Sequence, residues 1–227
     1  MQKIFVYSIS ILIFLAGNVS RAQDKKLLKD TTNEAWFDGI SIQTDLASFA
    51  NTLISNGATF STEGSVQLNL KHKLFPTLEI GYAGDHKTAL SQTEFNTSGL
   101  YGRIGIDLNL LKPKKDSQPT NNLLFGGVRL GFSHFAYNIT NIVQTDNYWG
   151  GIQVSNYLNV PVTKVWFEVV AGVQVEIIKN IYMGWTIRNK SLLGQDIVGK
   201  PTPYYIPGFG TNTGSTWGFS YLIGYHF

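Results

Sequence analysis

The chain has 227 residues and a formal net charge of +3, with 15% charged, 13% aromatic and 43% hydrophobic residues and 23 glycines. Few charges combined with many aromatic residues and glycines favour strands and turns over a helical or disordered protein. No basic patch points to a nucleic-acid partner, and the absence of cysteine excludes thiol catalysis, disulfides and cysteine-ligated metal.

The amino terminus has the order of a secretory signal. Lys3 is followed by the apolar run 4–16 and by the small-x-small site Ser20-Arg21-Ala22. This run is shorter than the ~20 residues that a spanning helix needs, although an uncleaved inner-membrane anchor is an alternative. We therefore expect residues 1–22 to be a signal peptide and the charged residues 23–35 to be a flexible periplasmic lead-in.

Alternation of apolar and polar residues then predicts about eight strands. In the first of them, Ile40 and Ile42 alternate with Ser41 and Gln43. Runs with the same period of two begin near residues 65, 77, 100, 124, 167, 181 and 215. The runs are separated by long segments at 48–62, 84–97, 136–161 and 191–214, an intermediate turn at 111–121 and short turns at 71–76 and 179–180.

The last stretch, Ser215 to Phe227, shows this pattern most clearly. Every odd position from Trp217 onward is apolar, whereas the even positions are small or polar apart from Leu222. A helix would spread the aromatic residues around its whole circumference, so we expect a strand. It resembles the terminal strand of bacterial outer-membrane β-barrels, which implies that Tyr225 and Phe227 are the assembly signal for the barrel assembly machinery.

Together these elements predict an all-β fold, a transmembrane antiparallel up-and-down β-barrel of about eight strands over residues 36–227. Long and short connections alternate, as in barrels with extended external loops, brief periplasmic turns and both termini in the periplasm. An even number of strands closes without leaving an edge in lipid. The predicted location is therefore the outer membrane, in contact with its lipid.

The polar row of the strands is predicted to face the barrel interior. It is rich in glycine, which suits the narrow lumen of about eight strands, whereas a soluble lipocalin-like barrel, the alternative, would turn a charged row to water. Single charges of both signs in this row should pair, because an unpaired buried charge is costly. The predicted lumen network comprises Glu79, Arg103, Asp107, Arg129, Glu168, Glu176 and Arg188.

Several short motifs resemble a known family. The segments are Asn109-Leu110-Leu111, Phe125-Gly126-Gly127, Tyr148-Trp149-Gly150-Gly151, Met183-Gly184-Trp185 and Pro207-Gly208-Phe209-Gly210. They are similar to segments of a Bacteroidetes-type family of small exported proteins known only as a domain of unknown function. The resemblance covers residues 36–227 and implies a small outer-membrane β-barrel, with no catalytic or ligand residues to carry over.

The sequence gives few signs of chemistry. The four histidines lack metal-ligand spacing, and there is no nucleophile elbow, phosphate loop or dinucleotide fingerprint, so we predict no metal, no cofactor and no enzyme. The lumen charges predict a structural plug or, as an alternative, a narrow channel for small solutes. A second alternative is a lipid-modifying outer-membrane enzyme, whose residues would be scattered along the chain.

Aromatic residues in two long loops are the remaining candidates. Loops on a rigid scaffold often carry binding residues, so they predict a surface that recognises an envelope protein or an external ligand. The alternative is that they pack over the barrel mouth. These residues are Tyr148, Trp149, Tyr204, Tyr205 and Phe209.

Overall fold

The computed structural model of the chain describes residues 36–111, 122–145, 150, 152–194 and 201–227. These residues belong to one compact unit, Ala35–Phe227. Predictions for residues 1–35, for the turn at 112–121 and for Tyr148 and Trp149 lie outside the described residues. The elements in chain order are β1 (Gly39–Asp45), α2 (Leu46–Ile54), β2 (Thr59–Asn69), β3 (Leu74–Thr88), β4 (Glu94–Asn109), β5 (Leu123–Thr145), β6 (Ile152–Ile178), β7 (Ile181–Leu193), β8 (Tyr205–Ile206), β9 (Gly210–Thr211) and β10 (Ser215–His226).

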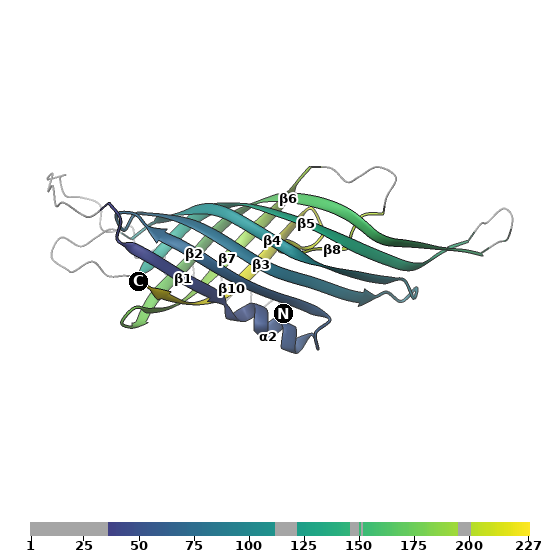
Figure 1. Ribbon diagram of the computed structural model, residues 1–227, viewed down its shortest axis with the longest axis horizontal. Helices are drawn as coiled ribbons and strands as arrows, with labels where there is room; N and C mark the ends of the chain where they lie inside the picture. The colour runs from purple at the N-terminus through teal and green to yellow at the C-terminus, as the bar shows by residue number, and fades with distance from the viewer. Residues whose placement is uncertain (1–35, 112–121, 146–149, 151, 195–200) are drawn as a thin grey trace, which may run out of the picture. The chain divides into compact units, whose positions relative to one another are not determined.

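Eight strands close into a ring in the order β1, β10, β7, β6, β5, β4, β3 and β2 (Figure 1). All neighbouring strands are antiparallel. The prediction of an all-β, antiparallel up-and-down barrel is therefore confirmed. We call the end that holds Gly39 and His226 the terminal end, and the opposite end, where β3 turns into β4, the loop end. The connection from β7 to β10 contains two short strands, β8 and β9, which pair with each other in a separate sheet.

The alternation seen in the sequence becomes the two faces of the barrel wall. Side chains of a strand point alternately to opposite faces, so Arg103 is 3% exposed while its neighbour Ile104 is 62% exposed. The same holds around the ring, where Asp107, Arg129, Glu168 and Arg188 are buried. In the middle of these strands the charged side chains thus face the lumen, and large apolar side chains face the outer surface.

Three segments predicted as loops contain regular structure. Most of 136–161 belongs to β5 and β6, most of 84–97 to β3 and β4, and residues 48–54 belong to α2. The period of two was interrupted in β5 because register shifts occur between Tyr137 and Ile139 and between Ile139 and Ile142. A bulge moves the following side chains to the opposite face, so a pattern of simple alternation ends there although the strand continues.

Helix α2 is short, with nine residues. Asp45 caps it, since its carboxylate accepts hydrogen bonds from Ala47 N at 2.9 Å and from the Ser48 hydroxyl at 2.8 Å. Among the described residues, no helix has both the length and the apolar character needed to cross a membrane.

Candidate functional site

Six charged side chains meet in the middle of the lumen, and Glu79 of β3 lies at their centre. Its Oε2 accepts hydrogen bonds from Arg103 and Arg188 at 2.8 Å each, and its Oε1 accepts one from Arg129 Nε at 3.1 Å. One carboxylate thus joins three arginines that come from β4, β5 and β7.

Two further carboxylates extend this pairing. Asp107 accepts hydrogen bonds from both terminal nitrogens of Arg129 at 2.7 Å, the bidentate geometry that binds a guanidinium most strongly. Glu168 lies 2.8 Å from Arg103 Nε and 3.4 Å from Arg188 Nη1. The structure therefore brings together six of the seven residues that the sequence predicted for the lumen network.

Glu176 is the seventh, and it lies apart from the other six. It is half-buried near the turn between β6 and β7, where its Oε1 accepts a hydrogen bond from Asn180 N at 2.8 Å. Its position in the alternation is that of Glu168, but it lies eight residues further along β6. At a rise of 3.3 Å per residue this places it about 26 Å further along the strand, toward the terminal end. Alternation predicts which face a side chain occupies, but not its depth.

Three members of the network were not predicted. Glu63 lies 2.5 Å from Arg103 Nη1, Trp166 Nε1 donates to Glu168 at 2.6 Å, and Lys190 donates to the carbonyls of Gly208 and Phe209 at 2.8 and 3.1 Å. A signal for two of them exists in the sequence, since Glu63 precedes the lumen-facing Ser65 by two residues and Lys190 follows Arg188 by two.

The network closes the middle of the barrel. Four carboxylates, including Glu63, face three arginines and Lys190, so the charges balance among the described residues. A buried charge that loses its partner costs several kcal/mol, and the set is therefore expected to act as one unit. The space left beside Glu79, Asp107 and Arg129 is about 10 Å³, at most one water molecule.

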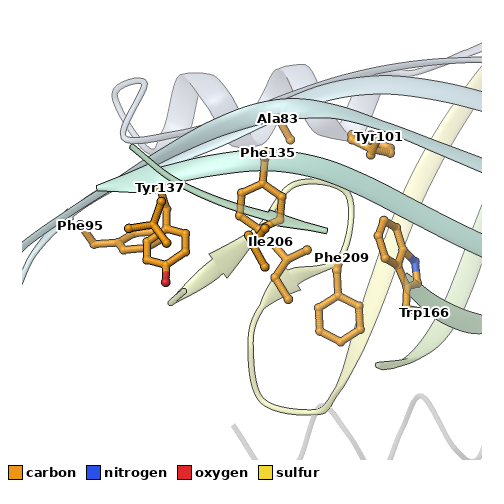
Figure 2. Packing of buried hydrophobic residues seen from close by; sticks show 10 residues of the cluster. Ala83, Phe95, Tyr101, Phe135, Tyr137, Trp166, Ile206 and Phe209 are labelled. Carbon is orange, nitrogen blue, oxygen red and sulfur yellow. The ribbon is translucent and has the colours of Figure 1, made fainter. Parts of the chain in front are cut away.

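Apolar side chains fill the lumen between the network and the loop end (Figure 2). Trp166 and Phe209 pack edge to face, with ring centroids 6.0 Å apart. Phe209 and Ile206 come from the connection between β7 and β10, which folds back into the barrel. Phe209 is 1% exposed, so it belongs to this plug and not to a recognition surface.

Gly208 allows the connection to enter the lumen. Its φ is +80°, and a Cβ there would lie 2.4 Å from a ring carbon of Tyr101, so only glycine fits. Its carbonyl accepts hydrogen bonds from Arg103 at 2.7 Å and from Lys190 at 2.8 Å. The inserted connection thereby becomes a part of the charged network below it.

The other loop aromatics, Tyr204 and Tyr205, lie at the rim of the loop end. They line a cavity of about 340 Å³ together with Thr59, Asp85 and Lys87. Asp85 is buried, and its Oδ1 accepts a hydrogen bond from the Thr59 hydroxyl at 2.5 Å, but its Oδ2 has no partner among the described residues. This oxygen is closed to solvent, so it is a buried acceptor beside the rim cavity, whose polar lining residues include Thr59, Asp85, Lys87 and the two tyrosines.

Two titratable groups of the rim cavity have shifted pKa values. Burial, with a smaller contribution from the nearby Asp85 carboxylate, raises the pKa of Tyr205 to about 12. The pKa of the Lys87 ammonium is also raised, because the Tyr204 hydroxyl oxygen accepts its hydrogen bond. At neutral pH the Tyr205 phenol is therefore protonated and Lys87 carries its positive charge.

The histidines are distributed over the barrel. His72 pairs with Asp38 at 2.9 Å near the terminal end, His86 lines the rim cavity, and His134 and His226 lie on other strands. Within the ranges that the structure describes, no three His, Asp or Glu side chains are grouped so as to hold a metal ion.

The residues predicted as the assembly signal lie on the outer surface at the terminal end. Tyr225 and Phe227 are exposed, with ring centroids 4.7 Å apart. The backbone N–H of Phe227 donates to the Ile40 carbonyl at 2.8 Å, so the last residue still takes part in the closure between β1 and β10.

One family model matches the chain, over residues 1–227, and its description is domain of unknown function (DUF6048). The chain therefore belongs to this uncharacterised family. A search of curated proteins found no match.

Proposed function

We propose that this member of the DUF6048 family is an outer-membrane β-barrel with a closed lumen, which acts through the surface at its loop end. The observation that carries the proposal is the distribution of polarity. The eight charged groups of the network are buried in the lumen, whereas exposed apolar side chains cover the outside of the strands, including Leu78, Ile104, Leu130, Trp185 and Phe219. Such a surface is unfavourable in water and suits hydrocarbon.

Helix α2 also has polar side chains facing the protein and apolar side chains facing outward. Its Ser48, Thr52 and Ser55 side chains turn toward the protein, whereas Leu53 and Ile54 are 79% and 81% exposed. A helix on a protein surrounded by water normally buries its apolar face against the core. The inverted arrangement in α2 is expected where the surroundings are lipid.

A closed barrel fits this structure better than the two alternatives. A channel for small solutes would require the ion pairs among Glu79, Arg103 and Arg188 to separate together, because they cross the lumen. A lipid-modifying enzyme would require a nucleophile beside a base, and the buried network instead contains carboxylates paired with arginines, which stabilise charge without supplying a nucleophile-base pair. We therefore infer a structural role for the lumen.

The rim cavity is the candidate recognition site. Asp85 and Lys87 line it, and its two tyrosines offer ring faces and hydroxyls. A carboxylate beside tyrosines suits ligands with several hydroxyl donors, and we infer that the ligand is a saccharide. Binding of a glycan library to the purified barrel should be lost in Asp85→Asn and retained in Asp38→Asn, a change at the terminal end.

The location can be tested by labelling single cysteines, because the natural chain has none. Leu90 is fully exposed in the turn between β3 and β4 at the loop end, and Lys179 is exposed in the turn between β6 and β7 at the terminal end. Leu90→Cys should react with a membrane-impermeant maleimide on intact cells, and Lys179→Cys only after the outer membrane is permeabilised. Reaction of Lys179→Cys but not Leu90→Cys on intact cells would reverse the orientation, and recovery of both variants in the soluble fraction would refute the membrane location.

A further inference from the structure

The ring of strands is incomplete in one half of its wall. β1 ends at Asp45, which pairs with Leu222 of β10, and its last partner in β2 is Gly64. β10 continues toward the loop end as Ser215–Tyr221 and β2 as Thr59–Glu63, with no strand between them. Helix α2 occupies this place and lies against the wall (Figure 1).

The helix is fastened to one side of the opening. The Thr52 hydroxyl accepts a hydrogen bond from Ser61 N at 3.4 Å, and the Ser55 hydroxyl donates to the Thr59 carbonyl at 2.7 Å, so side chains of α2 replace a strand along β2. Toward β10, the Asp45 carboxylate accepts from Tyr221 N at 3.0 Å. The backbone N–H of Phe219, two residues nearer the loop end than Tyr221, points to the same side of β10. Among the described residues, no strand pairs with this side of β10 between Ser215 and Tyr221.

A cavity of about 160 Å³, which we call the wall cavity, lies at this place. Ser48 and Asn51 of α2 and Gly218 and Phe219 of β10 line it, and Phe219 is 58% exposed on the outer surface. Its lining thus includes residues of the lumen, of α2 and of the outer surface of β10.

Charged side chains of both signs line this wall cavity. They are Arg103, Arg188, Lys190, Glu63 and Asp45. Two of the three donors of the Lys190 ammonium are used by the carbonyls of Gly208 and Phe209, and Arg188 Nε is buried without a hydrogen-bond partner among the described residues. Arg188 is paired with Glu63, Glu79 and Glu168, whereas Lys190 forms no ion pair among the described residues, so its ammonium is the group with which an anionic head group would pair.

We propose that the wall cavity binds a long-chain fatty acid, with its carboxylate at Lys190 and Arg188 and its acyl chain leaving between α2 and β10 past Phe219. This inference rests on the proposed membrane location. A single carboxylate would supply the ion pair that Lys190 lacks among the described residues, and the volume of about 160 Å³ accommodates this group with the first methylenes. The remainder of the acyl chain would lie against Leu53 and the exposed apolar side chains of the strands, next to the acyl chains of the surrounding lipid.

The test is photolabelling of the purified full chain in phosphatidylcholine vesicles with a diazirine derivative of palmitate, followed by mapping of the labelled peptides. Labelling should be saturable and concentrated on α2 and β10. Gly218→Leu, which places a side chain in the wall cavity, should reduce it about tenfold or more. Gly126→Leu is the matched control, since Gly126 faces outward from β5 with open space around it, and it should label as the unchanged chain does.

The head-group assignment has its own test. Lys190→Met should weaken the apparent palmitate affinity about tenfold, the usual effect of losing a charge-assisted hydrogen bond, and palmitate methyl ester should compete poorly with the acid. Equal competition by the methyl ester would overturn the carboxylate site, and equal competition by phosphatidylglycerol would assign the cavity to a phospholipid and overturn the fatty acid.

Failure of this inference is distinguishable from failure of the membrane location. Labelling spread evenly over the exposed apolar side chains of the strands, in a chain whose Leu90→Cys variant reacts on intact cells, would refute the wall site while leaving the location intact. A chain found in the soluble fraction would refute both.

Discussion

The middle of the lumen and its loop-end part are filled by different kinds of side chain, although the same strands line both parts. In the middle, Glu79 and its arginines hold the wall together through ion pairs. Toward the loop end, Trp166 and Phe209 fill the space by apolar packing. An ion pair binds specific strands at a fixed level, whereas apolar contact tolerates shape changes, so the middle is expected to fix the register and the loop end to close the mouth.

The two halves also differ in where their parts come from. The side chains of the network belong to the strands themselves, whereas the apolar half depends on a connection that is far from β5 and β6 in sequence. The Gly208 carbonyl couples them, because it accepts hydrogen bonds from Arg103 and Lys190. Substitutions in each half can therefore show how strongly the two are coupled.

The largest effect is expected for Glu79→Gln. This change removes the negative charge shared by three arginines, and the free energy of unfolding should fall by about 3–5 kcal/mol, as when one partner of a buried ion pair is removed. The measurement is guanidinium unfolding of the barrel refolded in phospholipid vesicles. Glu176→Gln is the matched control, since Glu176 lies outside the network and should lose less than about 1 kcal/mol. Equal losses in the free energy of unfolding for the two variants would show that the network does not stabilise the barrel more than an ordinary polar contact does.

A somewhat smaller effect is expected for Phe209→Ala. Truncation of a buried aromatic side chain leaves a cavity beside Trp166, and the free energy of unfolding should fall by about 3 kcal/mol in the same assay. Tyr204→Ala changes a half-exposed residue of the same connection and should lose about 1 kcal/mol or less. A loss at Tyr204 as large as that at Phe209 would mean that the rim, and not the plug, closes the mouth.

The smallest effect concerns alkaline pH and Tyr205. A phenol whose pKa is raised to about 12 on folding binds its proton more tightly in the folded state, so its contribution to stability is complete below about pH 10 and is lost as the pH rises toward 12. Between pH 9 and 11.5 the unchanged chain should therefore lose about 2 kcal/mol more than Tyr205→Phe. Tyr204→Phe is the control and should keep the alkaline loss. An identical pH profile for the unchanged chain and Tyr205→Phe would contradict the burial of this hydroxyl.

Much of the fold could be predicted because the relevant signal is local. The period of two in β4, β7 and β10 tells which side chains share a face, and the shortage of charge on one face tells which face is apolar. The prediction weakened where a bulge shifts the register, as in β5 after Tyr137, and where the chain leaves the pattern to form α2. These are positions at which tertiary contacts, and not the local pattern, maintain the structure.

The candidate sites were harder to predict for the same reason. Glu176 and Glu168 have equivalent positions in the alternation. They differ only in their position along the strand, which places Glu168 in the network and Glu176 beside the turn between β6 and β7. Phe209 and Tyr204 lie in one aromatic connection, yet one enters the lumen and the other remains at the rim. The two glutamates are chemically identical, and the hydroxyl of Tyr204, which accepts a hydrogen bond from Lys87, is the one local difference between the two aromatic residues.

The amino-acid sequence by itself determined the number of strands, their antiparallel order and the inward position of the charges, because alternation along an extended chain is set by each strand alone. Only the tertiary structure decided which charges meet, how the β7–β10 connection enters the lumen and where α2 takes the place of a strand. Those features depend on the stagger between strands far apart in the chain, and stagger is a property of the closed ring.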